Sequence, residues 1–242
     1  MTAHIRPGAF DSVRTALAEL AARYPGARVL DVGGGSGTRA VPLAVAGCRV
    51  TVIDTSIDAL AMLRRRAEDA GVADRVVGIQ ADADGLREVI PAGETDLVLC
   101  HHVLEELDDA GAAVAAMVAA LAPGGAVSVL AAGRFSAVLG QTMAGRFGQA
   151  AAMLDDPDGR FGPSDPLRRR FDVGGLDALL SEHGLTVENI CGVGVAGGLV
   201  SGAVRTAAQD EEGLGELESR LAGHPQLREI ASDLHAIAVL PG

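Results

Sequence analysis

An acidic residue and a cluster of glycines are the groups in this sequence best suited to hold a small polar ligand. Asp31 is followed by four glycines within the stretch Arg28–Thr38: Gly33, Gly34, Gly35 and Gly37. The apolar run before them predicts a buried parallel strand, and the glycines allow a sharp turn whose backbone lies close to a ligand. Arg39–Gly47 is compatible with a helix, whose first amide N–H groups favour an anion. The stretch therefore predicts a strand, a ligand-binding turn and a helix.

The spacing of the glycines separates two cofactor classes. The dinucleotide fingerprint G-x-G-x-x-G requires glycine three residues after Gly35, where this chain has Thr38, so a nicotinamide-dependent oxidoreductase is disfavoured. The spacing Asp31-x-Gly33-x-Gly35-x-Gly37 instead resembles the first motif of class I S-adenosylmethionine-dependent methyltransferases. That resemblance implies a turn that cradles the methionyl half of S-adenosyl-L-methionine. A tight strand-to-helix turn without a ligand is the structural alternative.

Two further acids follow the next two predicted strands. Asp54 ends the strand Arg49–Ile53, 23 residues after Asp31, where nucleoside-binding α/β folds place an acid on the ribose hydroxyls. Its alternative role is a helix N-cap, since Asp54, Thr55 and Ser56 precede a helical pattern. Asp82 follows the strand Arg75–Ala81. The resemblance implies that Asp82, with Ala83, contacts the adenine, and a turn or cap role is the alternative.

A pair of histidines follows the fourth predicted strand, Thr95–Cys100. Open α/β sheets bind ligands at the carboxyl ends of their strands, so His101 is the best-placed general base for a hydroxyl or amine acceptor. We expect the backbone around His101 to face the methyl group. His102 is interpreted as a residue that hydrogen-bonds loop carbonyls.

An acceptor that is itself a carboxylate needs no base. It needs a cation to orient it, and arginine suits this better than lysine because its guanidinium group donates two parallel hydrogen bonds to a carboxylate. Arg134 and Arg146 are the substrate-binding candidates, and the run Arg168–Arg170 is more simply a solvated surface patch.

A second set of motifs extends the resemblance across the chain. Leu121–Gly125 is similar to the turn before the fifth strand of class I methyltransferases, and two ordered motifs are more specific than one. The layout is most like the bacterial branch that esterifies the carboxymethoxy group on the wobble uridine of tRNA. The residues that carry this likeness are Gly33–Gly35, His101-x-Val103-Leu104-Glu105, Met143-Ala144-Gly145-x-Phe147, Leu217-Glu218-x-x-Arg220 and His235. The resemblance implies methyl transfer to an O acceptor, including a carboxylate, or to an N acceptor. The tRNA ester and a non-catalytic cofactor-binding module are the alternatives.

The order of elements predicts the fold. Five alternating strand–helix units imply a parallel sheet with helices on both faces, and the resemblance extends this to an α/β, Rossmann-like, seven-stranded, mostly parallel sheet. Leu185–Val195 and Asp233–Leu240 supply the antiparallel pair. We expect one domain over residues 1–242, in which the insertion Gly133–Arg170 forms a cap on the substrate side. Ala196–Ser232 is a second extra region, with a charged helix from Glu211 to Leu221.

The amino-acid composition limits the classes of molecule that the protein can bind. Hydrophobic residues make up 48% of the chain and aromatic residues only 2%, so the core is aliphatic and few rings are available to stack on bases. A net charge of -12 disfavours DNA and anionic membranes. We expect a small-molecule or tRNA acceptor, no metal, and a cytoplasmic location, since no stretch reads as a membrane helix or signal peptide. Cys48, Cys100 and Cys191 read as buried thiols.

Overall fold

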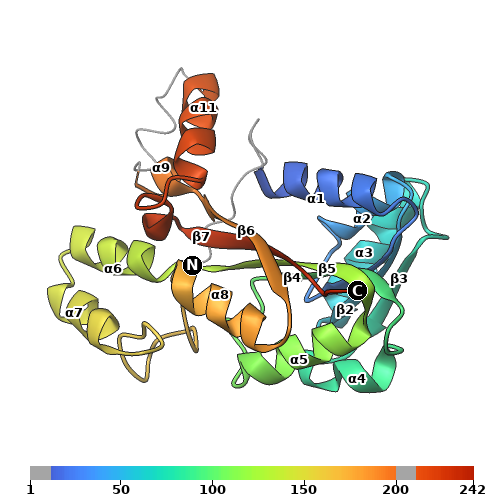
Figure 1. Ribbon diagram of the computed structural model, residues 1–242, viewed down its shortest axis with the longest axis horizontal. Coiled ribbons are helices and arrows are strands. Elements are labelled where there is room, and N and C mark those ends of the chain that lie inside the picture. Colours follow the sequence, from blue (N-terminus) through green and yellow to red (C-terminus); the bar gives the residue numbers. More distant parts are fainter. Residues whose placement is uncertain (1–11, 200–210) are drawn as a thin grey trace.

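A seven-stranded sheet forms the centre of the protein in a computed structural model that describes residues 12–199 and 211–242 (Figure 1). Part of the second extra region, Ala196–Ser232, lies outside the described residues. The strands run in the order β3-β2-β1-β4-β5-β7-β6. Their bounds are β1 Arg28–Val32, β2 Arg49–Asp54, β3 Val76–Gln80, β4 Thr95–His101, β5 Leu121–Ala132, β6 Thr186–Val193 and β7 Asp233–Val239.

The predicted fold class is confirmed. Strands β1 to β5 pair in parallel, as expected for strand–helix units that all cross over in the same sense. The antiparallel strand is β7, which enters between β5 and β6 and pairs with both. Strand β5 is longer than predicted and begins at Leu121, because Leu121 already pairs with Thr95 of β4, before an irregularity in the register that ends at Ala126.

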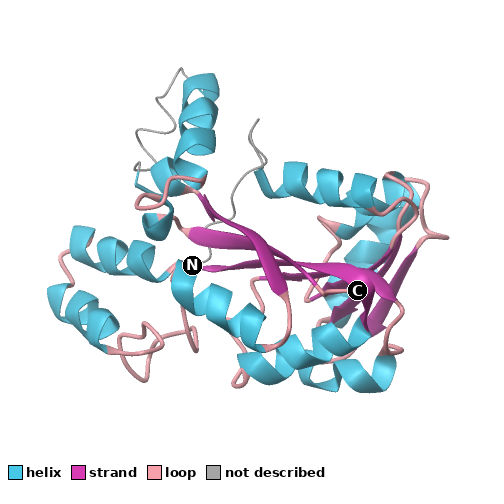
Figure 2. Ribbon diagram, in the orientation of Figure 1, coloured by secondary structure: helices cyan, strands magenta, loops and turns pink. Residues whose placement is uncertain are grey.

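Helices cover both faces of the sheet (Figure 2). One face is covered by α1 Ser12–Arg23, α2 Ala40–Val45 and α3 Ile57–Asp69. The other is covered by η1 Ala83–Gly85, α4 Leu86–Val89, α5 Ala110–Ala120 and α8 Val173–Glu182. Alanine, valine and leucine fill both layers, so the core is aliphatic as expected. Within the described residues, no helix combines the length and the apolar character that crossing a membrane requires.

The insertion after β5 leaves the sheet and returns to it at one point. Gly133 forms a parallel bridge with Phe171, whose amide N–H donates to the carbonyl of Ala132 at 2.9 Å. Between them lie α6 Arg134–Met143 and α7 Phe147–Asp155. The two helices are separate because Gly145 has φ +72° and turns the chain between them. The two helices enclose a small core of their own, made by Val138, Ala150, Met153 and Phe161.

The second extra region joins β6 to β7. Its described elements are α9 Val195–Leu199, α11 Glu211–Ala222 and η2 Arg228–Ile230, so the predicted charged helix is present. Glu218 of α11 accepts hydrogen bonds from the amides of Val195 and Gly197 and thereby fixes the start of α9. Figure 1 shows both extra regions beyond the carboxyl ends of the parallel strands.

Candidate cofactor and acceptor site

The sheet order brings the predicted site residues to one edge. Asp54 is the last residue of β2, His101 is the last residue of β4, and Asp31 lies one residue before the end of β1. Asp82 follows β3, the next strand beyond β2. The connections reverse direction between β1 and β4, and open α/β sheets bind ligands at such a switch point. The four side chains therefore come from four adjacent strands around the expected crevice.

Strand register puts the polar groups on a single face. Asp31 pairs with Leu99, and Leu99 pairs with Ser128, so these side chains project to the same side. His101 shares that side with Leu99, and so does His235 of β7, since its partner Leu130 lies two residues after Ser128. This is the face covered by α1, α2 and α3. The other face is apolar along the same strands.

The glycine turn packs closely against the acids. The Gly33 amide N–H donates to the carbonyl of Ile53 at 2.7 Å, and the Gly35 amide N–H donates to Asp54 Oδ2 at 2.9 Å. A Cβ at Gly34 would lie 2.4 Å from the carboxyl of Asp31, so only glycine fits there. A Cβ at Gly35, where φ is +54°, would meet only Asp54 Oδ2, at 3.7 Å. The turn therefore packs tightly against Asp31 at Gly34, whereas the space next to Gly35 is open.

Asp31 is a buried acid with spare hydrogen-bonding capacity. It is 2% exposed, and its Oδ2 accepts no hydrogen bond from the described residues. Burial raises the pKa of Asp31 to about 7, and the nearby Arg39 partly opposes this while Asp54 adds to it. A buried carboxyl oxygen without a partner is costly. A cationic donor such as an ammonium group would satisfy it, so the residues at this turn fit an amino-acid ligand.

Arg39 is a site residue that sequence reasoning missed. It stands at the start of α2, and its charge lowers the pKa of both Asp31 and His101. It therefore lies between the glycine turn and the end of β4. The available signal was an arginine placed directly after the glycine turn, which we treated only as the beginning of a helix.

The structure excludes the N-cap role for Asp54 and retains the turn role for Asp82, which is at the N-cap position of η1 and whose carbonyl accepts the Gly85 amide N–H at 3.1 Å. The N-cap of α3 is Ser56, whose Oγ accepts the amide of Ala59 at 3.2 Å. Asp54 instead accepts the amides of Gly35 and Ser56, at 2.9 and 2.8 Å, and so joins β2 to the glycine turn. Asp82 is exposed and makes no side-chain cap bond. Thr55 is exposed beside Asp54, and Ala83 is buried beneath Asp82.

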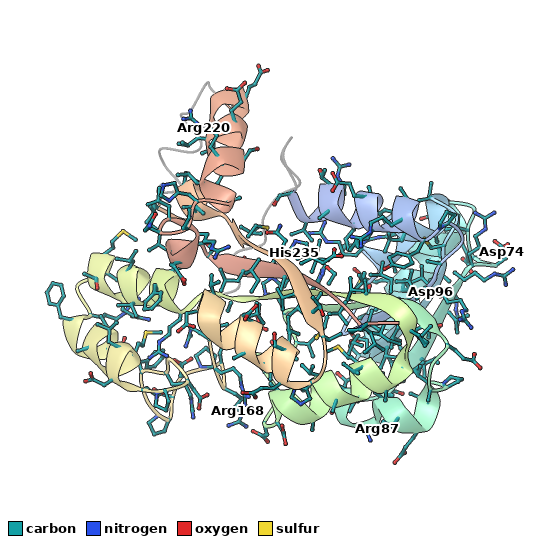
Figure 3. All side chains as sticks on the ribbon, in the orientation of Figure 1. Asp74, Arg87, Asp96, Arg168, Arg220 and His235 are labelled. Carbon is teal, nitrogen blue, oxygen red and sulfur yellow. The ribbon has the colours of Figure 1, made fainter. Side chains whose placement is uncertain are left out.

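His101 belongs to a buried polar chain. Its Nε2 lies 3.0 Å from Ser128 Oγ, which lies 2.8 Å from His235 Nε2, and the two rings meet edge to face. Figure 3 shows His235 in the interior of the protein. Burial lowers the pKa of His101 well below its usual value, and His235, Arg39 and His102 add to the effect. This setting disfavours a protonated His101 and therefore the predicted role as a base.

His102 is placed differently from our expectation. Its ring does not bind loop carbonyls, because Nδ1 lies 3.0 Å from Glu105 Oε1 and 3.9 Å from Asp233 Oδ1. The side chain is 50% exposed, whereas that of Glu105 is 3% exposed. The hydrogen bond that His102 donates to Glu105 raises the pKa of His102, against the effect of burial.

The structure gives the predicted substrate arginines other contacts. The guanidinium of Arg134 donates to the carbonyls of Asp156, Pro157 and Leu154 at 2.7 to 3.1 Å, which satisfies the end of α7. Arg146 is exposed at the turn between α6 and α7, where its Nε contacts Gln141. This geometry favours a structural role for Arg134 and leaves Arg146 as an outer surface group.

The run Arg168–Arg170 is only partly the surface patch that we expected. Arg170 makes a two-pronged ion pair with buried Asp165, at 2.9 and 3.0 Å. Arg169 donates to the carbonyls of Leu107 and Asp108. Arg168 alone is a surface residue, as Figure 3 shows, and it pairs with the exposed carboxylate of Asp108.

Comparison with known proteins agrees with this geometry. Residues 29–125 match a family model described as a methyltransferase domain. The tRNA 5-carboxymethoxyuridine methyltransferase of Escherichia coli (strain K12) is 31% identical over 120 residues, which cover 50% of this chain and 46% of that protein. The ubiquinone biosynthesis O-methyltransferase of Aromatoleum aromaticum is 38% identical over 102 residues, 42% of each. The chain thus spans about half the length of the curated relatives it matches.

A solved structure shows the same fold. The geranyl diphosphate C-methyltransferase of Streptomyces coelicolor A3(2), solved with S-adenosyl-L-homocysteine, has a TM-score of 0.62 at 15% identity and covers 93% of this chain and 76% of its own. Residues 29–125 thus carry a methyltransferase domain match, and the whole chain has the fold of class I methyltransferases. The curated relatives are named for tRNA 5-carboxymethoxyuridine and for ubiquinone biosynthesis, and the matched residues make up less than half of each relative.

Proposed function

We propose that this protein transfers a methyl group from S-adenosylmethionine to an oxygen acceptor. The observation that carries the proposal is the buried, unpartnered oxygen of Asp31 beneath a glycine turn that is open above Gly35. An amino-acid group carries both the ammonium that Asp31 lacks and a carboxylate that suits the start of a helix. The domain match and the fold support the same cofactor.

Different residues of the protein bind different parts of the cofactor. Asp31 accepts from its ammonium, while Arg39 and the first amides of α2 hold its carboxylate. Asp54, with Thr55 beside it, faces the ribose, and Asp82, with Ala83, faces the adenine. The flexible glycine backbone, Gly33 to Gly37, packs along the methionyl chain. The bound cofactor supplies an activated methyl, so the protein has to contribute placement, exclusion of water and removal of any proton.

We further propose that the insertion of residues 133–170 covers the acceptor and that the chain acts as one domain. The insertion is closed at its base by the Gly133–Phe171 bridge, at the carboxyl end of β5. Its returning segment contacts the loop after β4, where the Arg168 amide N–H donates to the Glu105 carbonyl at 2.8 Å. Both contacts lie beside the end of β4, where His101 and His102 stand.

The acceptor has two candidate classes. A ring hydroxyl is favoured by the ubiquinone O-methyltransferase relatives, and a carboxymethoxyuridine in tRNA is favoured by the relative from Escherichia coli. Each relative matches only about half of this chain, so their acceptors do not transfer with the match. The first experiment is calorimetric titration with S-adenosylhomocysteine, with NAD as the control. Binding of NAD alone, or of neither compound, would refute the proposed cofactor.

Substitution of Gly35 by Ala tests the open side of the turn. The new methyl group would point into the space above Gly35 and exclude the cofactor, so we expect affinity for S-adenosylhomocysteine to fall by about 10-fold or more. The left-handed φ also costs the folded protein about 1 kcal/mol. Gly26→Ala is the matched control, since Gly26 has φ +73° with nothing within 4 Å and lies at the opposite end of β1. Equal binding by both variants would contradict the proposed position of the cofactor.

Substitution of Asp54 by Ala should weaken cofactor binding by about 1–3 kcal/mol, because ribose hydroxyls lose a charged acceptor. The free protein should also lose about 1 kcal/mol of stability, since the Gly35 amide loses its partner. Calorimetry and urea unfolding measure the two effects separately. Asp58→Ala, an exposed acid in the first turn of α3, serves as the control and should change neither quantity. Unchanged cofactor affinity in Asp54→Ala would exclude the ribose role.

A further inference from the structure

The loop after β4 holds one residue in an unusual backbone conformation. His102 has φ +57°, and it is the only non-glycine residue with positive φ within the described ranges, 12–199 and 211–242. Its amide N–H donates to the carbonyl of Leu130 at 2.7 Å, which keeps the backbone in this position. Side chains in this region are strained, and such strain concentrates at functional sites. The strain here turns the imidazole away from the sheet interior, where the preceding His101 points.

A buried carboxylate fixes the orientation of the His102 ring. Glu105 Oε1 lies 3.0 Å from His102 Nδ1 and also accepts the Ala132 amide N–H at 3.2 Å. Glu105 is 2% exposed, and its own carbonyl binds the returning end of the insertion through Arg168. Since a carboxylate accepts, Nδ1 carries the proton, and the Nε2 lone pair of the half-exposed ring is free to take another.

The charges around His102 favour a second proton on its ring. Asp233, at the start of β7, lies 3.9 Å from Nδ1, and Glu106 adds a further negative charge nearby. The hydrogen bond that His102 donates to Glu105 raises the pKa of His102 although burial opposes it, and His101 is the remaining titratable neighbour. Burial raises the pKa of Asp233 itself to about 6. Of the two adjacent histidines, His102 is therefore the one whose surroundings favour a positive charge.

The position of the loop relates His102 to the cofactor. The next residue, Val103, packs directly on the glycine turn, because a Cβ at Gly33 would lie 2.4 Å from Val103 Cγ2. The returning segment of the insertion binds the same loop through Glu105. His102 therefore stands between the proposed place of the methionyl chain and the insertion that we propose to cover the acceptor.

We propose that His102 and Glu105 form a catalytic dyad that takes the proton of a hydroxyl acceptor during methyl transfer. This inference rests on the proposed function. The acceptor oxygen forms a bond to the methyl carbon while the carbon–sulfur bond breaks, and that electron pair stays on sulfur to give S-adenosylhomocysteine. The hydroxyl proton passes to His102 Nε2, the imidazolium is stabilised by Glu105, and the proton then leaves to solvent. His102 is the catalytic residue, and Glu105 positions it.

The dyad selects the class of acceptor. A carboxylate has no proton to lose and needs a cation, yet Arg134, Arg169 and Arg170 are bound to carbonyls or to Asp165. Glu105 and Asp233, whose carboxyl oxygens lie 3.0 and 3.9 Å from His102 Nδ1, also disfavour an anionic acceptor next to this ring. The geometry therefore assigns a neutral hydroxyl, such as that of a phenol, to this site.

Two ligands that differ by one charge at the reacting atom provide the test. S-adenosylmethionine carries a positive sulfonium, whereas S-adenosylhomocysteine carries a neutral sulfur. If His102 faces the methyl, NMR titration of its Cε1 proton should give a pKa lower in the first complex by roughly one pH unit. His183 at the end of α8 is the internal control, and its Cε1 proton should give the same NMR signal in both complexes. Equal His102 pKa values in the two complexes would overturn the proposal, whereas absence of binding by either ligand would instead refute the proposed cofactor.

A kinetic measurement separates catalysis from structure. With catechol as a hydroxyl probe, His102→Gln should lower kcat by about 100-fold or more while S-adenosylhomocysteine affinity stays unchanged. Glu105→Gln should move the acidic limb of the pH–rate profile to lower pH, because the carboxylate that raises the His102 pKa is gone. His224→Gln, in the connection after α11, is the control variant. Wild-type kcat in His102→Gln would overturn the dyad.

Discussion

Replacing Asp31 with Asn is expected to stabilise the free protein at pH 8 while it removes most of the affinity for the cofactor. Folding raises the pKa of this buried carboxyl from its usual 3.8 to about 7, chiefly through burial. The folded state therefore binds the proton more tightly than the unfolded state, and stability falls as the pH rises from about 4 to 7. At pH 8 the penalty is on the order of 4 kcal/mol at most. Asparagine keeps the shape of the side chain without this penalty.

The same substitution removes the acceptor that we assign to the ammonium of the cofactor. A hydrogen bond between charged groups contributes about 1.5–3 kcal/mol, so affinity for S-adenosylhomocysteine should fall by about 10-fold to 100-fold. Urea unfolding at pH 5 and pH 8, together with calorimetry, measures both effects. Some pH dependence should remain, because Asp233 and His102 also have raised pKa values. A variant that is less stable than wild type at pH 8 would show that the carboxylate is compensated in the free protein.

Asp58→Asn is the matched control for this experiment. Asp58 is also an acidic residue close to the junction of a strand and a helix on the same side of the sheet. Unlike Asp31, it is exposed, in the first turn of α3. Its substitution should leave both stability and affinity unchanged, within about 0.5 kcal/mol. If only the substitution at position 31 raises stability and weakens binding, the buried carboxylate of Asp31 destabilises the free protein and serves to bind the ligand.

The second large effect is expected at the ion pair inside the insertion. Asp165→Ala leaves Arg170 as a buried charge without its partner, and breaking such a pair costs about 3–5 kcal/mol. The substitution also frees the amides of Phe161 and Leu167, which donate to Asp165 at 3.1 and 3.0 Å. We expect the thermal midpoint to fall by roughly 10 °C. Arg168→Ala, which breaks the exposed pair with Asp108, should cost less than about 1 kcal/mol.

The pH dependence of this pair has the opposite sign to that of Asp31. Burial opposes ionisation of Asp165, but hydrogen bonds from Arg170 and two amides outweigh it and lower its pKa. The folded state therefore binds the proton less tightly, so the stabilisation is present at neutral pH and is lost as the pH falls below about 4. Differential scanning calorimetry at pH 7 and pH 3 should show a smaller difference between wild type and Asp165→Ala at the lower pH. An equal difference at both values would contradict the ion-pair explanation.

The sequence by itself determined the elements and the cofactor edge of this protein. Strand and helix patterns are local, and the acid-and-glycine spacing from Asp31 to Gly37 reflects one turn whose geometry depends on neighbouring residues alone. Asp54 and Asp82 could be located because parallel strands that alternate with helices must end at the same edge. The fold class and the class of cofactor followed from these local features.

Only the tertiary structure decided which polar side chains are free to act. Ser128 joins His101 and His235 from positions 27 and 107 residues away, and no local pattern reveals such partners. Arg134 looked available in the sequence, yet its guanidinium binds carbonyls about twenty residues later at the end of α7. The sequence identifies His102 only as a loop residue, whereas the structure shows its positive φ and its hydrogen bond with buried Glu105. Burial and long-range hydrogen bonds determine whether a side chain can bind or transfer a proton, and both arise only when the chain is folded.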